Sequence, residues 1–227
     1  KLLIILLCSF SLSAFSQNDS LYAMKNGVII HSFSIDSNHI DSIIFYRPNI
    51  TTPSITDADG NVYTSVTIGT QEWMSENLRT TKYSDGTDIP NVAYNIAWKN
   101  LSTGAWCNYD NSSSNDATYG KLYNWYAVET EKLCPTGWHV PTDSEWTVLT
   151  DYLAADGHSG AEGNALKSTS GWNSGGNGTD DYGWLGLPGG LRSYNDGFFY
   201  YIGYYGYWWS SSQVNTSFVW SRYLYYS

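Results

Sequence analysis

The chain has 227 residues, of which 42% are hydrophobic and 14% charged, so it can build at least one folded core and is not a disordered chain. Its formal net charge is −10, with only 11 Lys and Arg residues. Because nucleic acids and anionic membrane surfaces are bound through clustered cations, neither is an expected partner.

The first 16 residues have the pattern of a secretory signal peptide. An apolar run over residues 2–10 precedes small residues at Ala14 and Ser16, three and one positions before the expected cleavage point. This run is too short to cross a bilayer and no later stretch is longer, so we expect no membrane span. The protein is therefore expected to be exported: secreted, on the cell surface, or associated with the outer membrane.

Residues 17–50 are expected to form a small β-strand unit. Two apolar runs, residues 21–24 and 28–33, flank Lys25-Asn26-Gly27, and Asn-Gly is a strong hairpin turn signal. A third strand is expected at residues 43–46. Residues 51–56 then read as a linker, within a stretch that contains two prolines.

From residue 57 the pattern predicts short strands, long turns and two helices. Residues 62–68 alternate at period two and predict a strand, with residues 71–78 as its partner. A first helix is expected over residues 120–128 and a second over 142–155. The second begins with a capping box, in which Thr142 is followed three positions later by Glu145. Strands joined by long loops are expected after Ser168.

The sequence contains no serine-hydrolase motif, no metalloprotease motif and no nucleotide-binding loop. The four histidines have no other His or Cys at metal-ligand spacing, and His139 is expected to be structural. The chain is therefore expected not to be an enzyme and to need no cofactor. One loop is rich in oxygen ligands, so calcium is a possible ligand of Asp110, Asn115 and Asp116, although these residue types also favour turns.

Two cysteines remain after the signal peptide, Cys107 and Cys134. In an oxidising compartment they predict a disulfide. Two alternatives stay open: both can be buried thiols, or one can pair with a cysteine beyond the end of this chain.

The C-terminal stretch, residues 194–227, has 15 aromatic residues out of 34. Rigid aromatics among Ser, Asn and Gly are typical of contact surfaces for a polysaccharide or a protein. Alternation over residues 218–224 indicates that about half of the rings face a core. The candidate ligand-binding residues are Tyr204, Tyr205, Tyr207, Trp208, Trp220 and Arg222. The alternative is a structural domain of the cell envelope whose aromatics are all core.

Eight short segments follow one another in the second part of the chain: DADGNVY at 57–63, IGTQEWM at 68–74, ENL at 76–78, KY at 82–83, YGKLYNWYA at 119–127, CPTGWHVPT at 134–142, LPGG at 187–190 and GYWWSS at 206–211. Taken in this order, they resemble the Fibrobacter succinogenes major paralogous domain. The resemblance covers residues 57–227. The unit at 17–50 resembles, more weakly, a strand module that precedes such domains in the Bacteroidetes lineage.

The resemblance implies an α+β, C-type-lectin-like domain: two helices packed on small antiparallel sheets, with long loops forming the binding face. The wider superfamily includes formylglycine-generating enzymes, and residues 140–146 look like their helix entry. No cysteine pair here matches their copper-binding pair, so the resemblance implies no catalysis. The family pattern continues past Tyr226 to an arginine-cysteine pair, which implies a C-terminal truncation. Some such domains display retroelement-diversified sequences, and residues 194–227 fit that bias.

Overall fold

The computed structural model describes residues 20–25, 28–34, 55–216 and 218–227, in two units that divide between Ile50 and Thr51. In the first unit, β1 (Ser20–Lys25) and β2 (Val28–Ser34) form an antiparallel hairpin. The predicted hairpin is thus confirmed. The expected signal peptide, third strand and first four linker residues lie outside the described residues.

The second unit begins with three short antiparallel strand pairs. These are β3 (Ile55–Thr56) with β4 (Val62–Tyr63), β5 (Ser65–Ile68) with β6 (Gln71–Met74), and β7 (Trp106–Cys107) with β8 (Leu122–Tyr123). The prediction of one strand over 62–68 was wrong at Thr64, whose backbone N–H donates to the Glu76 carboxylate at 2.8 Å. Residues 55–56 are strand and not linker, and β6 ends four residues before the predicted end.

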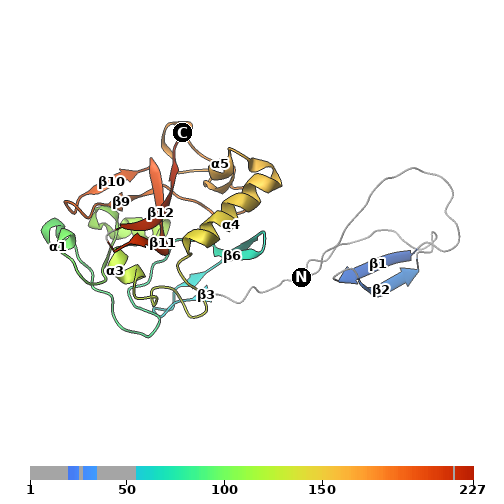
Figure 1. Ribbon diagram of the computed structural model, residues 1–227, viewed down its shortest axis with the longest axis horizontal. Helices are drawn as coiled ribbons and strands as arrows, with labels where there is room; N and C mark the ends of the chain where they lie inside the picture. Colours follow the sequence, from blue (N-terminus) through green and yellow to red (C-terminus); the bar gives the residue numbers. More distant parts are fainter. Residues whose placement is uncertain (1–19, 26–27, 35–54, 217) are drawn as a thin grey trace. The chain divides into compact units, whose positions relative to one another are not determined.

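A four-stranded sheet in the order β10-β9-β11-β12 carries the C-terminal aromatics (Figure 1). Its strands are β9 (Gly189–Arg192), β10 (Phe199–Ile202), β11 (Tyr205–Asn215) and β12 (Phe218–Tyr225). β9–β10 and β11–β12 pair antiparallel, whereas β9 and β11 meet in a parallel bridge between Gly190 and Gly206. A Cβ at Gly206 would lie 2.4 Å from the Leu187 carbonyl, so this contact requires glycine.

The long helix α4 (Asp143–Leu153) confirms the strongest helix prediction. The Thr142 hydroxyl accepts from the Glu145 backbone N–H at 3.2 Å, and the Glu145 carboxylate accepts from the Thr142 N–H at 2.8 Å, which completes the predicted capping box. Trp146, Leu149 and Leu153 are buried on its inner face. α4 lies across the domain beside the sheet (Figure 1).

The other helices are single turns. The prediction of one helix over 120–128 was therefore wrong for residues 120–124, and only residues 125–128 are helical. Gly120 has a positive φ of 67° and ends α2, and Asn124 starts α3 by accepting from the Ala127 N–H. Between them residues 122–123 form β8. The short helices are α1 (Asn95–Lys99), α2 (Asp116–Tyr119), α3 (Trp125–Val128) and α5 (Glu162–Leu166), with 3-10 turns at Tyr109–Asn111, Ser113–Asn115 and Asn173–Gly175 and a π turn at Ala154–His158.

The main core lies between α4, the β5–β6 pair and the four-stranded sheet. Trp73, Trp146 and Trp184 pack against one another with ring centroids 4.8–6.5 Å apart. Two smaller clusters surround Ile89 and Trp98. The domain is thus mixed α+β, with small sheets and few helices, and no described helix is long and apolar enough to cross a bilayer.

Candidate functional site

Eight tyrosines form one continuous group on β10, β11 and β12 and the residues next to them. Each ring contacts another of the group, with centroids 4.5–5.9 Å apart. We call this group the tyrosine cluster: Tyr200, Tyr201, Tyr204, Tyr205, Tyr207, Tyr223, Tyr225 and Tyr226. Its members come from both edge strands, β10 and β12, and from β11, so the cluster extends across the four-stranded sheet (Figure 1).

Strand register builds the centre of the tyrosine cluster. Tyr205 lies opposite Tyr225, and Tyr207 opposite Tyr223, in the β11–β12 pair. Because side chains alternate between the two faces of a sheet, these four rings share one face. Tyr205 and Tyr207 are stacked at 5.5 Å with an interplanar angle of 16°. The two rings are therefore nearly parallel neighbours along β11.

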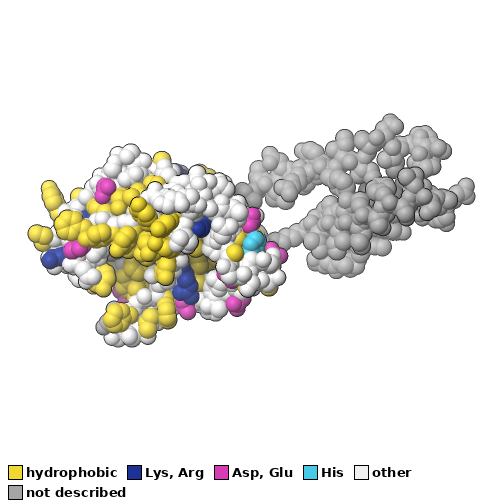
Figure 2. All heavy atoms as spheres, turned by 90° about the horizontal axis from the view of Figure 1, so that it is seen from above, with side chains coloured by type: hydrophobic (Ala, Val, Ile, Leu, Met, Phe, Trp, Pro, Cys, Tyr) yellow, Lys and Arg dark blue, Asp and Glu magenta, His cyan; other side chains and the backbone are white. Residues whose placement is uncertain are grey.

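The tyrosine cluster is largely open to solvent. Five of its members, Tyr200, Tyr201, Tyr204, Tyr223 and Tyr225, keep between 37% and 62% of their surface exposed. The face that carries β10 and the C-terminus is seen in Figure 2, where hydrophobic side chains gather in a broad patch. Tyr207 is half-buried, and burial, followed by the neighbouring tyrosines, raises its pKa to about 12. At neutral pH it is an uncharged phenol.

The opposite face of β11 and β12 holds the other three predicted ligand residues. The Trp208 ring packs on Trp184 at 4.9 Å and reaches the main core. Arg222 forms an ion pair with Asp143 at the start of α4, and its guanidinium lies 5.9 Å from the Trp220 ring. Trp220 is 44% exposed.

The six predicted residues are therefore not one site. Tyr204, Tyr205 and Tyr207 belong to the tyrosine cluster, and Trp208, Trp220 and Arg222 do not. Sequence reasoning missed Tyr223 and Tyr225, although their period-two spacing matched that of Tyr205 and Tyr207.

The predicted calcium residues have other partners. Asp116 pairs with Lys121 at 2.6 Å, and the Asn115 side-chain amide donates to the Tyr109 carbonyl at 2.9 Å. Asp110 adopts a positive φ of 53° in its turn. Within the described part of the chain no three His, Cys, Asp or Glu side chains gather as a metal site. The three residues lie in 3-10 turns and at the start of α2, and calcium binding by them stays a prediction.

Cys107 and Cys134 are separate, buried thiols in this structure, so the predicted disulfide between them is not formed here. Cys107 packs with Trp98 and Ala105. Burial raises the pKa of Cys107 to about 11 and that of Cys134 to about 12. Both thiols are therefore protonated and unreactive at neutral pH.

His139 lies in the loop before α4 and is largely exposed. Its Nε2 atom is 2.9 Å from the Glu145 carboxylate, the same group that completes the capping box of α4. This contact places His139 at the helix start, where it supports the capping residue.

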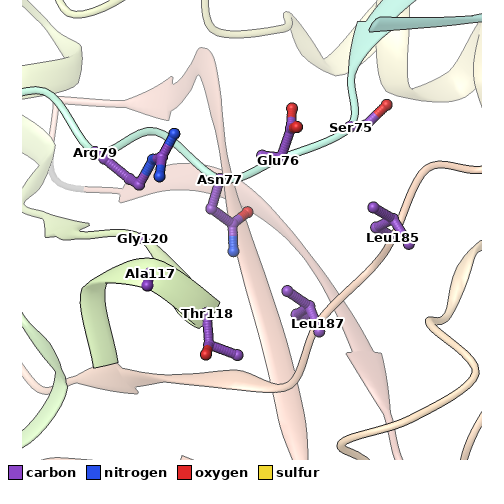
Figure 3. Close-up of a pocket in the computed structure, with 9 residues that line it drawn as sticks. All are labelled: Ser75, Glu76, Asn77, Arg79, Ala117, Thr118, Gly120, Leu185 and Leu187. Carbon is purple, nitrogen blue, oxygen red and sulfur yellow. The ribbon is translucent and has the colours of Figure 1, made fainter. Parts of the chain in front are cut away.

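A small pocket of about 250 Å³ lies between residues 75–79, α2 and residues 185–187 (Figure 3). Its acidic and amide groups are already bonded within the fold. The Glu76 carboxylate accepts from the Thr64 N–H and hydroxyl, and the Asn77 amide donates to the Tyr119 carbonyl at 3.0 Å. The polar groups that line the pocket therefore hold segments of the fold together. The tyrosine cluster remains the stronger candidate site.

Comparison with known proteins gives one match. The family model described as the Fibrobacter succinogenes major domain matches residues 66–226, more than half of the chain. Searches of curated proteins and of solved structures found no significant match. The matched range contains α4, the four-stranded sheet and the whole tyrosine cluster. The chain therefore belongs to the Fibrobacter succinogenes major domain family.

Proposed function

We propose that this protein is an exported, non-catalytic binding module of the bacterial cell surface or of a secreted protein. Its contact surface is the tyrosine cluster, and its ligand is a polysaccharide or a protein. The observation that carries the proposal is the exposure of five tyrosine rings within one continuous cluster on the four-stranded sheet. A compact domain would bury such rings if they served only its core.

The chemistry of tyrosine suits this role. A phenol ring gives a large contact area with few rotatable bonds, and its hydroxyl both donates and accepts hydrogen bonds. The rings hold one another in place, so little side-chain entropy is lost on binding. A C-type-lectin-like arrangement, in which such a surface is presented on a stable scaffold, belongs to the same proposal, as does export directed by residues 1–16.

A structural role in the envelope is the second candidate. It is favoured by Trp208 and Trp209, which pack inward: Trp209 lies 5.9 Å from Trp125 and donates to the Tyr123 carbonyl at 2.9 Å. Trp220 and the tyrosine cluster are not explained by this role. A retroelement-diversified display domain for protein ligands would use the same tyrosines and is a variant of the main proposal.

Binding of the intact chain to immobilised polysaccharides and to the extracellular proteins of the source organism tests the proposal. The double variant Tyr201→Ala/Tyr223→Ala should weaken binding at least tenfold, about 1.4 kcal/mol. The matched control is Tyr126→Ala, a 40% exposed tyrosine on α3 outside the cluster. If every ligand binds the double variant as it binds the unaltered chain, the tyrosine cluster is not the contact surface.

A further inference from the structure

A second exposed apolar feature lies beside α1. An open groove of about 620 Å³ is lined by residues 93–96 and Lys99 on one side and by Asp196 and Phe198 on the other. Tyr94, Ile96 and Phe198 are 83%, 72% and 53% exposed. These large apolar side chains are too exposed to contribute much to the core of the domain.

Arg192 holds the two walls of the groove in fixed positions. Its buried guanidinium donates to the Val92 and Ala93 carbonyls at 2.5 and 2.6 Å, and its Nε atom donates to the Gly197 carbonyl at 2.8 Å. A Cβ at Gly197 would lie 2.2 Å from the Asn95 carbonyl, so the walls touch through their backbones. The groove is therefore a preformed feature of the fold.

The groove and the tyrosine cluster are continuous through Asp196. The Asp196 carboxylate lines the groove and accepts from the Tyr200 hydroxyl at 2.9 Å. Tyr200 in turn contacts Tyr201 at 5.7 Å, and Tyr201 contacts Tyr205 at 5.2 Å. One exposed surface thus runs from α1 across β10 to β12.

The size of this surface distinguishes between kinds of ligand. At roughly 200 Å² for a fully exposed large side chain, the tyrosine cluster presents on the order of 500 Å² and the groove adds on the order of 400 Å². The largest apolar patch of an ordinary monomer is about 300–600 Å², and one side of a standard protein interface is about 800 Å². Only the combined surface reaches the size of a protein interface.

We propose that the groove and the tyrosine cluster form one docking surface for a folded protein partner, which inserts an apolar side chain between Ile96 and Phe198. This inference rests on the proposed binding role of the tyrosine cluster and names its ligand class. The combined area favours a protein over a small sugar ligand, and the tyrosine hydroxyls can donate to and accept from the backbone and polar groups of a protein surface.

Charge disfavours a second copy of this chain as the occupant. Each copy has a formal net charge of −10, and like charges of this size repel two approaching molecules. The groove contributes only Lys99 and Asp196 as charged side chains, which cannot offset that repulsion. The partner is therefore a different protein, with a contact region that is largely uncharged.

Photo-crosslinking with the intact chain tests this inference. Ile96→p-benzoylphenylalanine and Tyr223→p-benzoylphenylalanine are each exposed to the secreted and envelope protein fraction of the source organism. Val148→p-benzoylphenylalanine, at a 45% exposed position on α4, is the control. Both test positions should crosslink the same protein and the control should not. With that protein purified, Ile96→Asp and Tyr223→Ala should each weaken binding at least tenfold, and Val148→Asp less than twofold.

Other outcomes overturn the inference. These are crosslinks only between copies of the chain, no crosslinked protein from either position, or different proteins from the two positions. If binding to a neutral polysaccharide depends on Tyr223 and not on Ile96, the protein docking surface is wrong while the proposed binding role stands. If Tyr223→Ala changes the binding of no ligand, the proposed function itself fails.

Discussion

The indole N–H of Trp208 donates to the side-chain carbonyl of Asn77 at 3.1 Å, across 131 residues of sequence. The amide of the same Asn77 donates to the Tyr119 carbonyl at 3.0 Å. One side chain thus ties together three segments through which the chain resembles its family: residues 76–78, 119–127 and 206–211. These segments build the scaffold, and the tyrosine cluster is presented on it.

Replacing Asn77 should therefore destabilise the whole domain. Asn77→Ala leaves a partly buried indole N–H and a carbonyl without partners, which should lower the free energy of unfolding by about 2–3 kcal/mol. Trp208→Phe removes the indole donor and part of the ring that packs on Trp184, and should cost a comparable amount, about 2–3 kcal/mol, as for a lost buried hydrogen bond plus a small cavity. Urea denaturation measures both, with the exposed Asn195→Ala as control. An unchanged midpoint for Asn77→Ala would contradict the assigned role of this residue.

The walls of the α1 groove should depend on Arg192. Arg192→Met leaves the Val92, Ala93 and Gly197 carbonyls without their donor and should reduce stability by about 3 kcal/mol. Residues 92–99 should then exchange amide hydrogens faster, and hydrogen–deuterium exchange with mass spectrometry measures this. The control Lys99→Met alters an exposed cation that has no ion pair among the described residues. Equal exchange in both variants would show that Arg192 does not order the groove.

The start of α4 should give the protein a pH-dependent stability. Burial opposes ionisation of Glu145, but hydrogen bonds from Thr142 and His139 outweigh it and lower the pKa of this carboxyl. Its stabilising effect is therefore complete above the unfolded pKa of about 4.3 and is lost as the pH falls through the lower folded value.

Glu145→Gln should thus lower the free energy of unfolding by about 1 kcal/mol at pH 7. The difference from the unaltered chain should shrink steadily below about pH 4. Denaturation between pH 3 and pH 7 measures it, with Asp151→Asn, exposed on the same helix, as control. A difference that stays constant down to pH 3 would exclude the carboxylate as its source.

Cys107 and Cys134 should be slow to react in the folded protein. Burial keeps both thiols protonated, and the thiolate is the reactive form. At pH 8, alkylation of either residue should be negligible in the native chain and complete within minutes in guanidinium chloride. Peptide mapping by mass spectrometry distinguishes the two sites. Recovery of a disulfide-linked peptide containing Cys107 and Cys134 would contradict the structure.

Local sequence patterns were sufficient for features that depend on neighbouring residues. The Asn26-Gly27 turn predicts the β1–β2 hairpin, and Thr142 with Glu145 predicts the start of α4, because turn and capping bonds join residues two or three positions apart. The same reasoning failed over residues 120–128. There Gly120 and Asn124 interrupt the apolar pattern, and long-range pairing with Trp106 and Cys107 makes a strand of residues 122–123.

The amino-acid sequence by itself determined that the late part of this chain is aromatic, poor in charged residues and strand-forming, since composition and alternation can be read without knowing which segments pair. Only the tertiary structure decided which rings are exposed. Strand register placed Tyr205 and Tyr207 opposite Tyr225 and Tyr223 on the outer face and turned Trp208 toward the core. The hydrogen bonds of Arg192 to residues 92–93 and to Gly197 hold two distant segments together, so that Phe198 and Ile96 line one groove. Both arrangements depend on contacts between distant segments, which no local pattern encodes.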